Sequence, residues 1–119
     1  MNQVRVLVAA CTAALSIAAQ AHVRLDHADP RVGSTVQAAP AEVRLWFTEK
    51  LEPAFSTVRI VDANGKRVDA GRAKVDPRNR LLLSVPVANI GPGVYMAVWR
   101  AVSIDTHVTE GRFTFRVAN

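Results

Sequence analysis

The histidine at position 22 and an Asp-x-His sequence far downstream are the residues of this chain whose types and spacing could hold a metal ion. Residues 1–21 have the pattern of a cleavable secretory signal, with Arg5 before an apolar stretch and Ala-Gln-Ala at the end. Cleavage there would make His22 the first residue, with a free α-amine beside its imidazole. Asp105 and His107 would add a carboxylate oxygen and a second imidazole. The sequence therefore predicts a metal site built around a new N-terminus.

The expected donor set is one amine nitrogen, two imidazole nitrogens and one carboxylate oxygen. Such a mixed N,O set suits the square-planar or tetragonal geometry of Cu(II), which also lies at the top of the divalent affinity order. Zinc accepts the same donors but prefers a tetrahedron, and its structural sites often use thiolates. Cys11 is the only cysteine in the chain, so no thiol remains after position 21. We therefore expect one Cu(II) ion per chain, bound by His22, Asp105 and His107.

Two other candidates for metal binding are weaker. Copper(I) favours soft sulfur ligands, and Met96 is the only methionine after the signal. Met96 shares a strand face with Val94 and Val98, which favours a role in packing the core. His27 is interpreted as a surface or strand-end residue, with a second metal ion as the alternative.

The segment before His22 decides both the compartment and the ligand set. Signal cleavage predicts an exported domain over residues 22–119, and it lowers the formal charge from +5 to +4 because Arg5 is lost. Cys11 lies in a sequence that resembles a lipoprotein cleavage box, and lipidation there would leave His22 inside the chain. The apolar stretch between Arg5 and Cys11 is only five residues long, which is short for such a signal. Cleavage before His22 is therefore the favoured prediction.

The composition excludes several classes of partner. The basic residues form no Lys/Arg run and are not interleaved with aromatic residues, so nucleic acid is not expected as a partner. No second apolar run approaches the roughly 20 residues that are needed to span a bilayer. We therefore expect the processed protein to be soluble.

Short runs broken by Gly, Pro and Asn follow the signal, and none has a helical period. Three runs alternate apolar and polar residues, as strands with one buried face do, and two are more continuously apolar, as central strands are. The alternating runs cover residues 42–47, 57–60 and 112–117, and the apolar runs cover 81–87 and 94–102. Trp99 is expected in the core and Trp46 is expected to be half exposed. The pattern predicts an all-β domain.

Turn residues separate the predicted strands. Asn64-Gly65 predicts a hairpin with a type I′ turn, because both residues tolerate the positive φ angles that this turn requires. Six or seven short strands in a domain of this size favour a two-sheet sandwich of immunoglobulin-like type. A small barrel is the alternative.

Several of these segments together resemble the CopC family of bacterial periplasmic copper-binding proteins, over nearly the whole predicted mature domain. The segments that carry the resemblance are His22-Val23-Arg24-Leu25, Trp46-Phe47-Thr48-Glu49, Gly93-Val94-Tyr95, residues 99–107 (Trp-Arg-Ala-Val-Ser-Ile-Asp-Thr-His) and Gly111-Arg112-Phe113-Thr114-Phe115. The resemblance implies a seven-stranded Greek-key β-sandwich, immunoglobulin-like or cupredoxin-like. It also implies a Cu(II) site at His22, through amine and imidazole, and at Asp105 and His107. Glu49 matches a further ligand of some members.

The resemblance also implies a function. Some members hold Cu(I) in a Met-rich loop with a histidine, but residues 63–76 here contain neither Met nor His, so this chain resembles the subtype with a Cu(II) site only. The implied function is that of a periplasmic copper carrier or buffer in copper homeostasis or resistance, monomeric and not enzymatic. Its implied partner is an inner-membrane CopD-like protein.

Two other functions remain open. An N-terminal histidine with a second histidine also forms the copper brace of oxidative enzymes, so a copper oxidase is one alternative. A metal-free exported immunoglobulin-like interaction module is the other, because fold alone does not decide function.

Overall fold

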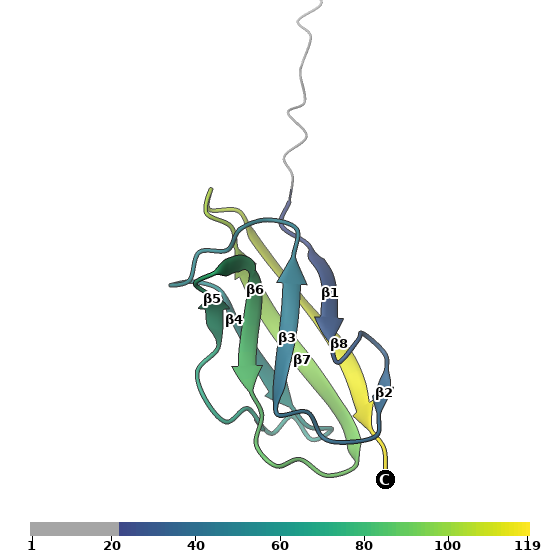
Figure 1. Cartoon of the computed structure of the whole chain (residues 1–119). Coiled ribbons are helices and arrows are strands. Elements are labelled where there is room, and N and C mark those ends of the chain that lie inside the picture. Colours follow the sequence, from purple (N-terminus) through teal and green to yellow (C-terminus); the bar gives the residue numbers. More distant parts are fainter. Residues whose placement is uncertain (1–21) are drawn as a thin grey trace, which may run out of the picture.

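Two β-sheets packed face to face make up the computed structural model, which describes residues 22–119 (Figure 1). The strands are β1 (Leu25–Asp29), β2 (Thr35–Val36), β3 (Glu42–Phe47), β4 (Thr57–Val61), β5 (Lys74–Asp76), β6 (Asn79–Pro86), β7 (Gly93–Val102) and β8 (Val108–Val117). One sheet has the order β1-β3-β6-β5 and the other has the order β2-β8-β7-β4. The predicted signal peptide, with Cys11, lies outside the described residues. No helix within 22–119 is long and apolar enough to cross a membrane.

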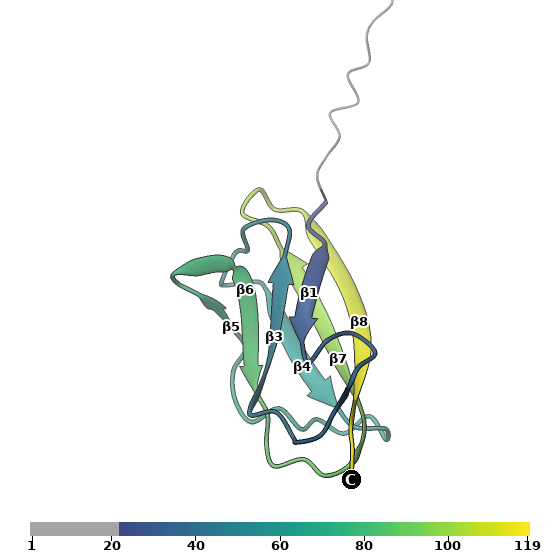
Figure 2. The same cartoon turned by 45° about the vertical axis from the view of Figure 1, so that its right-hand side comes forward.

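The predicted all-β sandwich is confirmed, and two separate sheets take the place of the alternative barrel. Residues 22–119 form eight strands, one more than the resemblance implies, and two of these strands are short: β2 has two residues and β5 has three. The chain leaves the first sheet after β1, pairs in parallel with β8 as β2 (Figure 1), and returns as β3. Figure 2 shows the connection from β1 passing by β8 before the chain enters β3. The continuously apolar runs become β6 and β7, both inner strands of their sheets.

The core lies between the sheets and follows the strand alternation. Val43, Leu45 and Phe47 on β3 are buried, and the ring of Phe47 meets the edge of Trp99 from the other sheet at 5.1 Å between centroids. Burial of large apolar side chains of this kind supplies most of the favourable free energy of folding. The contact between Phe47 and Trp99 therefore joins the two sheets near the end of β3.

The prediction that Met96 fills the core is wrong. On β7 the buried side chains are Tyr95, Ala97 and Trp99, so Met96 faces outward and is only half buried. Because β7 is apolar on both faces, its sequence does not show which face is inside.

The hairpin predicted at Asn64-Gly65 forms, but its turn differs from the predicted type I′. Among the described residues only Gly65 of this turn has a positive φ angle, of 79°. The carboxylate of Asp62 accepts hydrogen bonds from the backbone N–H groups of Asn64 and Lys66, both at 2.9 Å. Such an Asp side chain favours a right-handed turn at the next residues. The turn is therefore closed by one left-handed glycine.

Gly111 on β8 lies opposite Trp99 on β7 and makes room for the indole ring. A Cβ atom at position 111 would stand 2.3 Å from Cζ2 of Trp99. The rigid ring would have to shift and would disturb its contact with Phe47. We expect Gly111→Ala to lower the free energy of unfolding by about 2 kcal/mol, the typical cost of overpacking a core. Denaturant titration measures this change.

Gly91→Ala is the matched control, because a Cβ at position 91 would have no atom within 4 Å. Its free energy of unfolding should stay within about 0.5 kcal/mol of the wild-type value. Equal midpoints for wild type and Gly111→Ala would contradict the placement of the indole ring over Gly111.

Candidate metal centre

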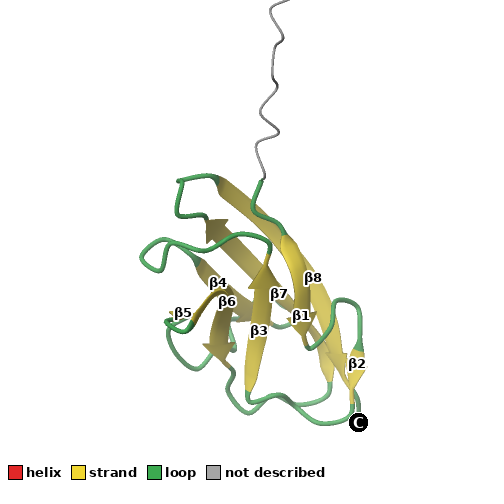
Figure 3. Ribbon diagram, turned by 45° about the horizontal axis from the view of Figure 1, so that its top comes forward, coloured by secondary structure: helices red, strands yellow, loops and turns green. Residues whose placement is uncertain are grey.

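Three segments that are distant in the sequence meet at one end of the sandwich (Figure 3). Arg24, just before β1, and Thr48, just after β3, exchange two hydrogen bonds: Arg24 N–H donates to Thr48 Oγ1 and Thr48 N–H donates to the Arg24 carbonyl, both at 2.9 Å. The N–H of Ile104, in the β7–β8 turn, donates to the carbonyl of Lys50 at 3.1 Å. The segments that carry His22, Glu49 and the Asp-x-His sequence are therefore tied to one another by their backbones.

His22 is placed by the residue that follows it. The Val23 side chain is fully buried in the core, whereas His22 is exposed. Together with the hydrogen bonds of Arg24, this burial anchors the chain directly after His22. A new N-terminus at His22 would begin one residue away from a fixed point of the fold.

The turn from Ser103 to His107 carries the two downstream ligands. The N–H of Ser103 donates to the His107 carbonyl and the N–H of Thr106 donates to the Ser103 carbonyl, both at 2.9 Å. The turn from Asp62 to Lys66 has the same two backbone bonds. Where that turn has Gly65, this one has Thr106, with a φ angle of 72°. A β-branched residue in the left-handed region is rare and strained.

Relief of this strain should stabilise the fold. We expect Thr106→Gly to raise the free energy of unfolding by about 1 kcal/mol, because the left-handed conformation costs an L-residue about 1–2 kcal/mol and glycine almost nothing. For a domain of this size that corresponds to an increase in Tm of about 4–8 °C. The reverse change in the matching turn, Gly65→Thr, should lower Tm by a similar amount. Calorimetry that shows no gain for Thr106→Gly would contradict the strain at position 106.

Asp105 is held as a carboxylate by a residue to which sequence analysis assigned no role. The Ser103 hydroxyl donates to Asp105 Oδ1 and accepts from the His107 N–H at 3.2 Å. The hydrogen bond from Ser103 holds the pKa of Asp105 below its usual value, against a smaller opposing effect of desolvation. Ser103 stands two positions before Asp105, and the Ser-x-Asp-x-His spacing was the signal that could have revealed it.

His107 lies near each of the other two predicted ligands. Its Nδ1 is 3.3 Å from Asp105 Oδ2, at an angle that makes no hydrogen bond, so this buried nitrogen has no hydrogen-bond partner among residues 22–119. The imidazole rings of His22 and His107 are tilted by 55°, with centroids 6.1 Å apart. A metal–nitrogen bond is about 2.0 Å, so rings on opposite sides of one ion have centroids about 6 Å apart. The spacing of these rings fits one shared ion.

Glu49 lies at the same end of the sandwich and, among the described residues, makes no hydrogen bond or salt bridge to His22, Asp105 or His107. It lines, with Ser103 and Asp105, a hollow of about 460 Å³ at the same end of the sandwich. Within residues 22–119 no group of three or more His, Cys, Asp or Glu side chains is close enough to enclose an ion. The structure thus brings together His22 with His107 and His107 with Asp105, whereas Glu49 and Asp105 only line the same hollow.

His27 is held in a different environment. A bulge in β1 at Asp26 turns His27 to the outer face of the sheet, where its ring stacks on Trp46 at 4.5 Å. Its Nδ1 is 2.6 Å from a carboxylate oxygen of Asp26. Trp46 is half buried and Trp99 is buried, as predicted. A second ion at His27 stays a prediction.

Residues 25–118 match the family described as CopC domain. Protein YobA of Escherichia coli (strain K12) is 36% identical over 98 residues, covering 82% of this chain and 79% of that protein. Copper resistance protein C of Pseudomonas syringae pv. tomato is 36% identical over 111 residues, covering 87% of this chain and 86% of the relative. The crystal structure of CopC from Methylosinus trichosporium OB3b superposes with a TM-score of 0.76 at 33% identity, covering 82% of this chain and 94% of that one.

Proposed function

This chain belongs to the CopC family, and from that premise we propose that it is a periplasmic copper-binding protein that holds one Cu(II) ion at His22, Asp105 and His107. It serves as a copper carrier or buffer in copper resistance. The observation that carries the proposal is the pair of imidazoles of His22 and His107, whose 6.1 Å spacing suits one ion between them. Asp105 supplies an oxygen beside them, which completes a set of ligands that favours Cu(II).

The expected ligand geometry favours binding over oxidation catalysis. With the His22 amine, two imidazoles and the Asp105 carboxylate around the ion, all four positions of a tetragonal plane are filled by the protein. An oxygen co-substrate would then have no open position in that plane. Glu49, which lines the same hollow as Asp105, is the candidate for a further ligand. The inner-membrane CopD-like partner and the monomeric state stay predictions.

A Cu(II) titration tests the proposal directly. The protein is purified after processing, its start at His22 is confirmed by intact mass, and copper binding is followed by electron paramagnetic resonance. We expect saturation at one equivalent, with a single tetragonal signal that shows nitrogen hyperfine structure. Several heterogeneous signals, or a processed start other than His22, would overturn the site. Sustained peroxide turnover in the presence of a reductant would overturn the carrier assignment in favour of an oxidase.

The Cu(II) affinity is expected to fall as the pH is lowered, because protons compete with the metal for the amine and imidazole nitrogens. Asp105 is not the limiting ligand. Its pKa is lowered by the Ser103 hydroxyl, so its carboxylate stays ionised until the pH falls through that lowered value. The decline should therefore follow protonation of the nitrogen ligands. Competition titrations between about pH 5 and 8 measure it, and an affinity that is constant over this range would exclude the nitrogen ligands.

A further inference from the structure

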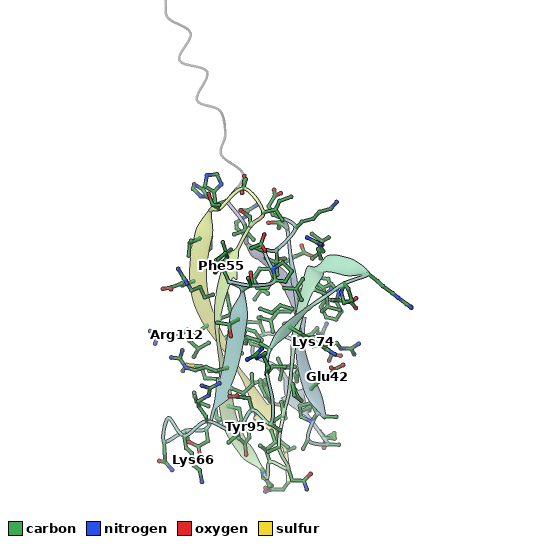
Figure 4. All side chains as sticks on the ribbon, turned by 90° about the vertical axis from the view of Figure 1, so that its left-hand side faces the viewer. Glu42, Phe55, Lys66, Lys74, Tyr95 and Arg112 are labelled. Carbon is green, nitrogen blue, oxygen red and sulfur yellow. The ribbon has the colours of Figure 1, made fainter. Side chains whose placement is uncertain are left out.

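One outer face of the sandwich carries a cluster of arginines. Arg59 on β4, Arg100 on β7, and Arg112 and Arg116 on β8 alternate with buried residues and point away from the core. Glu110 is the one carboxylate at an outward strand position of this sheet, so the net charge of these positions is +3. We call this surface the arginine face. Figure 4 shows Arg112 on one side of the sandwich, with Glu42 and Lys74 on the other.

The arginine face is not neutralised by neighbouring carboxylates. Among the described residues Arg59, Arg112 and Arg116 form no salt bridge, and Arg100 Nε lies 3.4 Å from a Glu110 oxygen in an exposed pair. On the opposite sheet, by contrast, Arg44 is 2.8 Å from Asp29 and 3.6 Å from Glu42. Lys74, Arg78 and Arg80 at the β5–β6 hairpin of that sheet also form no salt bridge, but Asp76 lies among them, so the net charge of residues 74–80 is lower than that of the arginine face.

The arrangement of the arginines suits phosphate groups. Arg59 and Arg112 both pair with Val98 in the strand register, so their backbones are about 10 Å apart on a continuous sheet. Between Arg59, Arg67 and Arg100 lies a hollow of about 320 Å³. Arg67 is fixed there by Asp69, 2.8 Å from its Nη2. Guanidinium groups bind phosphate oxygens in a bidentate manner, which a row of arginines can repeat across a surface.

Exposed apolar side chains lie on or beside the same face. Val94 on β7 and Val108 on β8 point outward and are 36% and 49% exposed. Phe55, two residues before β4, is 61% exposed and lies above Arg112 in Figure 4, near the end with the candidate metal centre. Basic residues with apolar side chains beside them are the pattern of proteins that rest on an anionic membrane surface.

We propose that the arginine face docks on an anionic phospholipid surface, with lipid phosphate groups at Arg59, Arg112 and Arg116 and in the hollow beside Arg100. The arginines lie on three neighbouring strands, β4, β7 and β8, and are accompanied by aliphatic residues, which suits a layer of headgroups better than a single acidic protein segment. Because Phe55 lies near the metal end, docking would hold His22 and His107 close to the membrane surface. On the proposed function, the bound copper ion would then lie near the membrane surface.

Vesicle sedimentation of the processed protein tests this proposal. Wild type should sediment with phosphatidylcholine vesicles that contain phosphatidylglycerol and should stay in solution with pure phosphatidylcholine. Arg59→Gln/Arg112→Gln/Arg116→Gln should bind about a hundredfold more weakly, because each arginine near an anionic surface contributes roughly fivefold. Phe55→Ser alone should also weaken binding relative to wild type. It should not change the dependence of binding on salt concentration, because it removes no charge.

The matched control is Lys74→Gln/Arg78→Gln/Arg80→Gln, which removes the same charge from the β5–β6 hairpin of the other sheet. It should weaken binding by less than about tenfold, because these residues lie off the docking face. Equal losses of vesicle affinity in the two triple variants would show that binding depends only on the net charge of the protein, which would overturn the proposal. So would binding to neutral vesicles, absence of binding, or displacement by inorganic phosphate at constant ionic strength. If the arginine triple variant fails to fold by circular dichroism, Arg112→Gln/Arg116→Gln replaces it.

Discussion

Replacement of His107 with alanine is expected to lower the Cu(II) affinity by more than about a hundredfold. Loss of a residue that only hydrogen-bonds to a metal ligand lowers metal affinity by up to about a hundredfold. Loss of a direct ligand should lower the affinity more than loss of such a supporting residue. The structure explains why the fold should survive the change. The His107 backbone, and not its ring, holds the turn, through the bond from Ser103 N–H to its carbonyl and the bond from its own N–H to Ser103 Oγ.

His27→Ala is the control for this experiment. It removes the same kind of side chain from a site on the outer face of β1, where the ring stacks on Trp46. Cu(II) affinity at one equivalent should be unchanged in this variant. Comparable weakening by the two substitutions would show that copper binds histidines without the predicted site. An unaltered affinity in His107→Ala would remove His107 from the site.

Extension of the processed chain by one alanine before His22 is the second large effect that we expect. The extra residue converts the His22 amine into an amide, which no longer offers the amine nitrogen to the metal. The chain cannot shift to compensate, because Val23 is fully buried and Arg24 is bonded to Thr48. Affinity should fall by more than about a hundredfold, as for any lost direct ligand. The nitrogen hyperfine structure in the electron paramagnetic resonance spectrum should correspond to one nitrogen ligand fewer.

A one-residue extension after Asn119 is the matched control, since it adds the same mass at the other terminus and should leave copper binding unchanged. Equal affinities with and without the N-terminal alanine would rule out the amine as a ligand. The imidazoles and Asp105 would then carry the site alone.

The fold could largely be predicted because most strands have one buried face and one exposed face. Alternation in β3 and β8 identified the buried residues Val43, Leu45, Phe113 and Phe115. The same rule failed on β7, where apolar residues on both faces hide which of Met96 and Tyr95 is inside. It also missed β2, whose two residues are held by pairing with β8 and not by any pattern of their own. Long-range pairing has no local sequence signal.

The sequence suggested which residues form the candidate site, but it did not give their arrangement in space. Donor chemistry selected His22, Asp105 and His107, and the hydrogen bonds that link residues 22–24, 48–52 and 103–107 bring these residues to one end. The Ser-x-Asp-x-His spacing is a signal for the role of Ser103 in holding Asp105, but the hydrogen bond itself follows from the shape of the turn. The strain at Thr106 could likewise not be predicted from the sequence, because a threonine does not indicate a left-handed backbone conformation.

The two facing histidines enter the site from different sheets. His22 precedes β1 of the first sheet, whereas His107 precedes β8 of the second. An ion that binds both would act as a cross-link between the layers in a domain whose described residues include no cysteine. It would close a loop over nearly the whole of residues 22–119, and a covalent link that closes a loop of such length is worth about 4 kcal/mol. Copper would then do for this sandwich what a disulfide does for small exported domains, and release of the ion would loosen the two layers at one end.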